Sequence, residues 1–285
     1  MTSDIQSPPT VFRPAAGGLR LLTWPALDAT GITAAVTARD GGASAGPYAT
    51  LNLSLSVGDE PASVLENRRR LAAALGASLD DFVFARQVHG AGVRVVGDAD
   101  RGSGAYSLDD AIGGADALVT ATPGLVLAIL TADCLPVVLH DPAAGVLACV
   151  HAGWRGTAAG VTAAAVTALR DLGSRPADIV AGLGPAIAGD HYQVGPDVHE
   201  AVAAAFGAAA AGFLRPDLRP DAPPDRWLLD LSLANRHALR AAGVPGDQIH
   251  ASAISTGTGE FFSDRAARPC GRLALVAQLN PGGAR

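Results

Sequence analysis

Two histidines and one cysteine follow short apolar stretches and could together bind a metal ion. His89 follows "FVFARQV", Cys134 lies in "TADCLP", and His151 lies in "VHAGWRG". Cysteine sulfur and histidine nitrogen suit Zn²⁺, and three protein ligands leave the fourth position open for water or substrate. Such a site would be catalytic rather than structural. The three residues are too far apart for a compact zinc motif, so the fold must gather separate strand ends.

The same residues also have simpler interpretations. Cys134 could be a small buried hydrophobic side chain, which is the commonest role of a lone cysteine in a strand. His89 and His151 could be hydrogen-bonded loop residues. Spacing alone does not decide between these interpretations and a metal site.

Glycines and arginines near these residues could bind an anion. In "HAGWRGT", Gly153 permits close backbone approach, Arg155 adds a charged donor, and the following helix would present N–H groups. Arg39 and the glycines after it form a similar loop. Both segments could equally be ordinary turns, with Trp154 packed in the core and Arg155 solvated.

The elements that must position these side chains are a mixture of strands and helices. The sequence predicts a strand at 32–37, a helix over 59–76 with start and stop signals, and a helix over 156–173. Four closely spaced strands fall within 116–151, joined by connections too short for crossover helices, so antiparallel or mixed pairing is expected. The order lacks regular βαβ alternation, which favours an α+β fold with mixed sheets.

Composition excludes several classes of protein. The 285 residues carry a formal net charge of −6 without basic runs, which argues against a nucleic-acid reader. The apolar runs are too short to span a membrane, and three cysteines make no disulfide framework. The N-terminus has no secretory signal. We therefore expect a cytoplasmic protein with a loose leader over residues 1–18 and one catalytic domain over residues 19–285; the sequence assigns no protein partner.

A series of motifs resembles a known family. "QVHG", "ADALVT", "LTADCLPVVLHD", "VHAGWRGT", "GPAI", "YQVG" and "FFSDR" occur in the order found in YfiH-like proteins. The resemblance covers roughly Leu21 to Leu279. Members of this family are described variously as multicopper polyphenol oxidoreductases (laccases), purine nucleoside phosphorylases and peptidoglycan editing factors.

The resemblance implies a fold and a set of site residues. The fold would be a four-layer α/β/β/α arrangement with mixed sheets, similar to the catalytic domain of cytotoxic necrotizing factor. The zinc ligands would be His89, Cys134 and His151. Positions that line the family's pocket map onto Arg39, Asn52, Asp133 and Arg155.

The activity that the resemblance implies is phosphorolysis of purine nucleosides, including methylthioadenosine, together with deamination of adenosine. Zinc would lower the pKa of a bound water, and Asp133 is the candidate carboxylate for carrying protons beside Cys134. Phosphate must be held near the breaking bond, and Arg155 could stabilise its charge. The nucleoside or phosphate is expected to contact four residues, which are Arg39, Asn52, Gly153 and Trp154.

Other functions remain open at this point. The first is a metal-free cysteine hydrolase with Cys134 as nucleophile and His151 as base, suggested by the toxin-like fold. The second is peptidoglycan editing, the removal of a misincorporated amino acid from a muropeptide precursor. The third is a copper polyphenol oxidase, which is less favoured because Asp190 and His191 replace the family's cysteine pair. A non-enzymatic binding module is the fourth.

Overall fold

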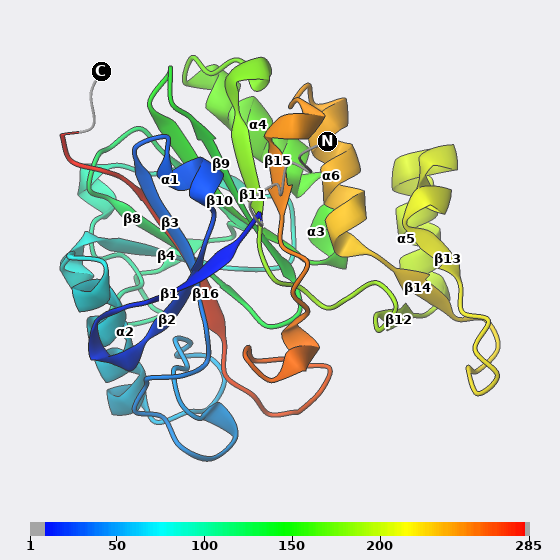
Figure 1. Cartoon of the computed structure of the whole chain (residues 1–285), viewed down its shortest axis with the longest axis horizontal. Helices are drawn as coiled ribbons and strands as arrows, with labels where there is room; N and C mark the ends of the chain where they lie inside the picture. Colours follow the sequence, from blue (N-terminus) through cyan, green and yellow to red (C-terminus); the bar gives the residue numbers. More distant parts are fainter. Residues whose placement is uncertain (1–8, 283–285) are drawn as a thin grey trace, which may run out of the picture.

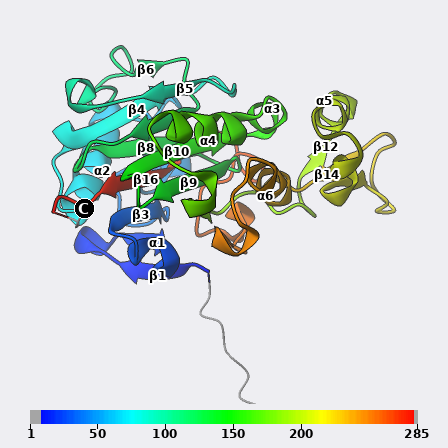
Figure 2. The same ribbon diagram turned by 90° about the horizontal axis from the view of Figure 1, so that it is seen from above.

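Two β-sheets pack face to face and form the body of the molecule (Figures 1 and 2). The structure is a computed structural model that describes residues 9–282. The first sheet has the strand order β1 (Val11–Pro14), β2 (Arg20–Thr23), β3 (Ile32–Thr37), β16 (Leu273–Leu279), β8 (Val126–Thr131), β4 (Phe82–Arg86) and β6 (Ile112–Gly113). The second has the order β15 (Ile249–Ala251), β11 (Val180–Leu183), β9 (Leu135–Asp141), β10 (Val146–Ala152), β7 (Ala117–Thr120) and β5 (Val93–Val95).

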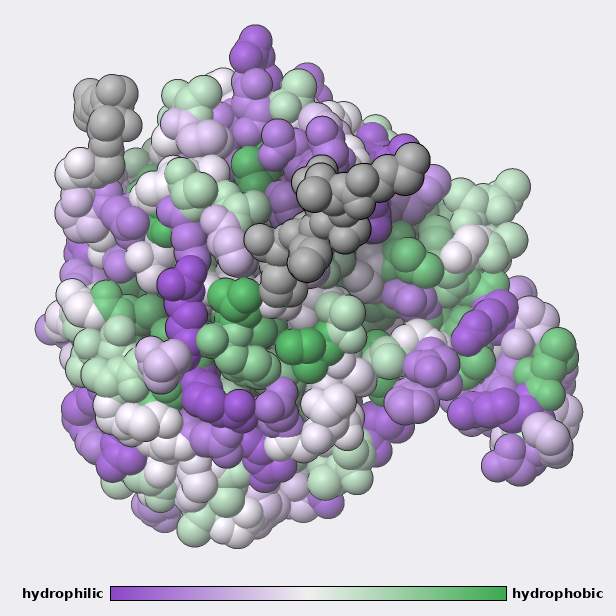
Figure 3. Space-filling model, in the orientation of Figure 1, coloured by the Kyte–Doolittle hydropathy of each residue, from purple (hydrophilic) through white to green (hydrophobic). Residues whose placement is uncertain are grey.

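A small third sheet projects from this body. It has the order β12 (Gln193–Val194), β14 (Trp227–Leu229) and β13 (Leu214–Pro216), and it lies beside α5 (Pro196–Phe206). In the space-filling view a hollow separates the projecting part from the body (Figure 3). The other helices are α1 (Pro25–Asp28), α2 (Pro61–Ala74), α3 (Trp154–Ala158), α4 (Val161–Asp171) and α6 (Leu231–Ala241).

Alternating side chains of the strands build apolar cores on both faces of each main sheet. On β10, Cys149 points into the core between the sheets, whereas Val150 points to the opposite face, under α4 and α6. On the first sheet, Leu275 faces the second sheet and Val276 faces the core that includes Leu71 of α2. Strands covered on both faces read as continuous apolar runs, which is why the sequence showed little alternation there.

The chain has a mixed α and β fold with mixed sheets, as expected. β9 and β10 form an antiparallel pair, and β7 pairs antiparallel with β10. β4 pairs with β8, and β5 with β7, in parallel. The four closely spaced strands do not all neighbour one another, however, because β8 lies in the first sheet and the other three in the second.

Two segments differ from the sequence prediction. The helix expected over 156–173 is divided into α3 and α4, because Gly160 between them has a φ of 81°. The second half of the expected leader contains β1, which pairs with β2 at the edge of the first sheet. Residues 1–8 of that leader lie outside the described residues. None of the helices within residues 9–282 has the length and apolar character that crossing a membrane requires.

Candidate metal centre

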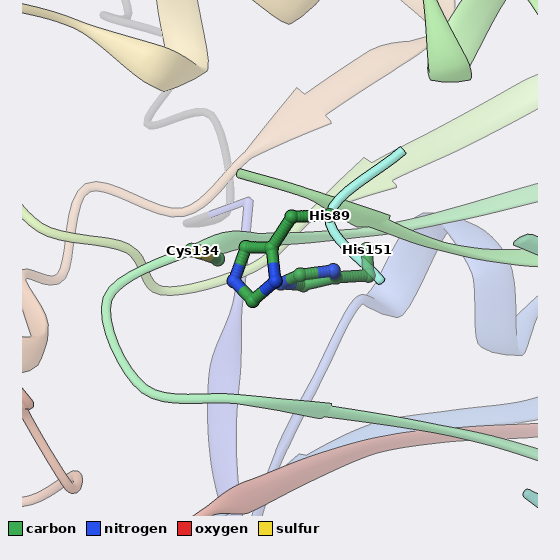
Figure 4. Close-up of side chains that lie close together, drawn as sticks. All are labelled: His89, Cys134 and His151. Atoms are coloured by element: carbon green, nitrogen blue, oxygen red, sulfur yellow. The ribbon is translucent and has the colours of Figure 1, made fainter. Parts of the chain in front are cut away.

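The structure brings His89, Cys134 and His151 together (Figure 4). Their potential ligand atoms all lie within 4.8 Å of one another. The two imidazole rings meet nearly at right angles, with centroids 4.7 Å apart. His89 follows β4 of the first sheet, His151 belongs to β10 of the second, and Cys134 lies in the turn that leads from β8 to β9. The expected convergence of strand ends is therefore present, and the ligands come from both sheets.

Asp116, which precedes β7, orients both histidines. Its Oδ1 accepts hydrogen bonds from Nδ1–H of His151 at 2.8 Å and from the backbone N–H of His89 at 3.0 Å. Its Oδ2 accepts from the backbone N–H groups of Gly90 at 2.7 Å and Val88 at 3.2 Å. When the imidazole is neutral, a carboxylate that accepts its Nδ1–H leaves Nε2 as the unprotonated nitrogen, which can bind a metal. Burial alone would raise the pKa of Asp116, but the hydrogen bonds from His151 and the backbone outweigh it and lower that pKa.

Two residues of the site have unusual backbone conformations. His89 has a φ of 59° and Asp133 a φ of 81°, in the left-handed region that non-glycine residues rarely adopt. Such conformations cost about 1–3 kcal/mol and persist where the surroundings impose them. Asp116 holds His89, while the carboxylate of Asp133 accepts hydrogen bonds from Oγ1 of Thr256 at 2.5 Å and from the backbone N–H of Arg265 at 2.7 Å.

Gly153 forms the wall behind the cluster. A Cβ at this position would lie 2.9 Å from Sγ of Cys134 and 3.2 Å from Cδ2 of His89. The close approach expected of this glycine therefore involves the metal-binding side chains. The helix that follows, α3, is only five residues long, so its N-terminus gives little support to the anion-binding interpretation.

The charges of Cys134 and His151 are coupled. Burial raises the pKa of the Cys134 thiol, but hydrogen bonds and charge from His151 and His89 outweigh this and lower the pKa from 9.0 to about 6. Burial lowers the pKa of His151, but Asp116 and Cys134 raise it to about 9. Without a metal the cluster can hold a thiolate–imidazolium pair. With one thiolate and two imidazoles, these residues fit the donor set of a zinc ion.

The cluster opens onto a cavity of about 720 Å³. The predicted residues Asp133, Trp154 and Arg155 line it together with the three ligands. Oγ1 of Thr131 also faces this region, and within residues 9–282 this buried hydroxyl has no hydrogen-bond partner. A cavity of this size matches the usual range for small-molecule sites.

Arg39 and Asn52 do not line this cavity. Nε and Nη2 of Arg39 both donate to the carbonyl oxygen of Ala49, and its guanidinium lies 4.9 Å from the ring centre of Phe262. Asn52 is fully buried, and its Oδ1 accepts the backbone N–H of Arg272 at 2.8 Å. The polar atoms of both residues bind neighbouring loop segments, and their contact with nucleoside or phosphate stays a prediction.

Sequence reasoning missed several residues of the site. Asp116, which holds the two histidines, was not singled out. Tyr192 and Arg265, which line the cavity, were not singled out either. Gln87 is a fourth, because its side-chain amide pairs with both the N–H and the carbonyl of Leu130 on β8. A signal existed for all four, since Gln87, Asp116, Tyr192 and Arg265 stand in the motifs "QVHG", "ADALVT", "YQVG" and "FFSDR".

The chain is similar to several known proteins over most of its length. Residues 33–280 match the family model described as multi-copper polyphenol oxidoreductase laccase. A Deinococcus radiodurans protein named purine nucleoside phosphorylase is 44% identical over 264 residues, covering 93% of this chain and 94% of its own length. Purine nucleoside phosphorylase YlmD of Geobacillus stearothermophilus is 40% identical, covering 82% and 85%. The crystal structure of YfiH from Bacillus licheniformis superposes with a TM-score of 0.87 at 35% identity, covering 94% of this chain and 99% of its own. The chain therefore belongs to the YfiH-like, laccase-domain family.

Proposed function

We propose that this protein is a zinc-dependent purine nucleoside phosphorylase. The observation that carries the proposal is the His89–Cys134–His151 cluster, which opens onto a cavity large enough for a nucleoside. Relatives that are 40–45% identical are named purine nucleoside phosphorylases. Nucleoside and inorganic phosphate are thus the proposed substrates.

The residues of the site divide the work as follows. His89, Cys134 and His151 would hold the zinc ion; Asp116 orients the ring of His151 and holds the backbone of His89. When bound, zinc supplies Lewis-acid polarisation and activates water. Trp154 offers an aromatic surface in the cavity, and the guanidinium of Arg155 lies 4.2 Å from its ring centre, where it can stabilise anionic charge.

We further propose that the same site deaminates adenosine and cleaves methylthioadenosine. Deamination needs a group that moves a proton to the leaving ammonia. Asp133 is that candidate, because it lines the cavity and precedes Cys134 in the chain. Thr256 and Arg265 each donate one hydrogen bond to this carboxylate. Each carboxylate oxygen can accept a further hydrogen bond.

A second candidate function is a metal-free cysteine hydrolase. The observation in its favour is the lowered pKa of the Cys134 thiol beside His151, which is the pairing that activates a nucleophilic cysteine. The two functions differ in their metal dependence. Zinc should protect Cys134 from alkylation and support turnover in a phosphorylase, whereas it should inhibit a cysteine hydrolase.

The test compares metal content and phosphorolysis of inosine in the wild type, His89→Ala and Cys134→Ser. We expect both variants to lose bound zinc and turnover together. His250→Ala is the matched control, since this histidine lies on β15, away from the cavity. Folded ligand variants that retain full activity would contradict the proposal.

Two finer predictions belong to the same proposal. A four-layer α/β/β/α description, like that of the necrotizing-factor domain, is supported by the separate cores on the outer and inner faces of the two sheets. A cytoplasmic location is supported by the three cysteines, all of which are free thiols.

A further inference from the structure

We propose that Arg155 and Arg265 together form an oxyanion-binding subsite beside the metal centre. Its ligand would be inorganic phosphate, and this identification rests on the proposed phosphorylase function. Both arginines line the cavity that contains Cys134, and Tyr192 lies on the same cavity wall.

Five arginines line this cavity, and three of them already bind other groups. Arg86 donates to the carbonyl oxygen of Leu108. Arg268 and Arg272 also line the cavity, but both form ion pairs with Asp264, at 2.5 and 3.2 Å. No carboxylate within residues 9–282 lies within ion-pair distance of Arg155 or Arg265. An anion entering the cavity therefore meets two positive charges that need not first be separated from a partner.

Neighbouring groups hold both arginines in place. The guanidinium of Arg155 lies over Trp154, and that of Arg265 lies 5.1 Å from the ring centre of Tyr192. Nη1 of Arg265 donates to the carbonyl oxygen of Gln193 at 3.1 Å, and its backbone N–H donates to Asp133. Arginine packed on an aromatic face loses less conformational entropy on binding and keeps its remaining N–H groups for a ligand.

The two arginines share one cavity with Cys134. Trp154, beneath Arg155, and Tyr192, beside Arg265, line the same cavity. An oxyanion between the two arginines would share the cavity with a nucleoside at the metal centre. Two planar guanidinium groups suit a tetrahedral phosphate because each can donate two parallel hydrogen bonds.

The test measures binding of inorganic phosphate to the zinc-loaded full chain by isothermal titration calorimetry. Arg155→Gln and Arg265→Gln should each weaken binding by about tenfold or more, since a charged hydrogen bond contributes at least that much. Arg265→Lys should restore part of the affinity. Arg268→Gln is the matched control, because this arginine lines the same cavity but is paired with Asp264. The affinity of this variant for phosphate should stay within about twofold of the wild-type value.

Steady-state kinetics provide the second measurement. In the Arg155→Gln and Arg265→Gln variants the KM for phosphate should rise while the KM for inosine changes little, and zinc content should remain that of the wild type. Unchanged phosphate affinity in both variants would overturn the subsite. A chain that binds a carboxylate probe such as N-acetylalanine but no phosphate would also overturn it as a phosphate site.

These results separate the subsite from the proposed function. Wild-type protein that binds phosphate through the two arginines but does not cleave nucleosides would support the subsite and contradict the phosphorylase function. Active enzyme whose KM for phosphate is unaffected by both substitutions would support the function and overturn the subsite.

Discussion

At the scale of single residues, the carboxylate of Asp116 accepts four hydrogen bonds from groups of the metal centre. We expect Asp116→Asn to weaken zinc binding by about 10–100-fold, because an amide replaces one acceptor oxygen by a donor and His151 or His89 loses its orientation. Competition with a chromogenic chelator measures this affinity.

Asp141→Asn is the control for this prediction. Asp141 is equally buried and accepts four hydrogen bonds, from backbone N–H groups and from Ser174, but it does not line the cavity. This variant should lose stability and keep its zinc affinity. Equal losses of zinc affinity in the two variants would show that general destabilisation, rather than orientation of the ligands, is responsible.

The role of Asp133 can be tested through its partner Thr256. If Asp133 moves a proton during deamination, Asp133→Asn should lower kcat for adenosine by about 10²–10⁴-fold. Thr256→Val keeps the carboxylate and removes only one hydrogen bond, so it should lower kcat by less than about tenfold. Similar losses in the two variants would instead indicate that Asp133 positions the segment that carries Arg265.

The lowered pKa of Cys134 predicts the pH dependence of alkylation in the metal-free protein. Because the pKa is lowered to about 6, the thiolate forms as pH rises through 6, and the labelling rate should level off above about pH 7. Burial raises the pKa of Cys270, which should label only at higher pH and serves as an internal control. Mass spectrometry of iodoacetamide-treated protein measures both. Labelling of Cys134 that begins only above about pH 8 would contradict the prediction, and bound zinc should suppress it.

The three potential metal ligands could be named from the sequence, whereas the residues that orient them could not. Spacing alone left simpler roles open for His89, Cys134 and His151, and the specific motifs in which they stand singled them out. Asp116 is an ordinary acidic residue until the fold buries it among four donors. Arg39 and Asn52 also stand in motifs, and in the structure their polar atoms bind neighbouring loop segments.

At the scale of elements, Arg68 joins α2 to two loops. Its Nε donates to the carbonyl of Leu53, and its Nη1 donates to the carbonyls of Gly104 and Ala105, at 2.7–2.9 Å. Its guanidinium lies 3.9 Å from the ring centre of Phe84. The side chain has almost no exposure, and burial lowers its pKa to about 10. The helix prediction for this segment was correct, but its pattern gave no sign that an arginine would be part of the core.

We expect Arg68→Lys to lower the free energy of unfolding by about 3 kcal/mol. A lysine keeps the charge in the same buried place but cannot reach all three carbonyls. The neighbouring Arg69 is exposed, so Arg69→Lys should change stability by less than about 0.5 kcal/mol. Urea unfolding followed by circular dichroism measures both. A change of the same size in the two variants would mean that the carbonyl contacts contribute nothing.

The pairing of strands was the least predictable feature at this scale. The apolar runs located β7, β8, β9 and β10 correctly. Their partition between two sheets depends on contacts with β16 and β4, which are distant in the sequence. Local patterns contain no information about such pairing.

At the scale of the whole molecule, the metal cluster joins the two sheets. Because the ligands come from both sheets, zinc binding should stabilise the complete fold rather than one loop. Free zinc at 100 times its Kd should raise the free energy of unfolding by about 2.7 kcal/mol. Thermal melting with zinc and with chelator measures the effect, which His89→Ala should abolish and His250→Ala should retain. A melting temperature that does not depend on zinc would contradict this prediction.

The wall formed by Gly153 has a consequence for inhibitors. With that side of the cluster closed by backbone, a small molecule approaches the sulfur and imidazoles through a cavity lined by five arginines and three aspartates. The excess of arginines makes the electric potential in the cavity positive, which attracts anions and repels cations. Dissolved salt weakens both effects. A dianionic chelator such as dipicolinate should therefore reach the metal faster than an uncharged one such as phenanthroline, and added salt should reduce its advantage.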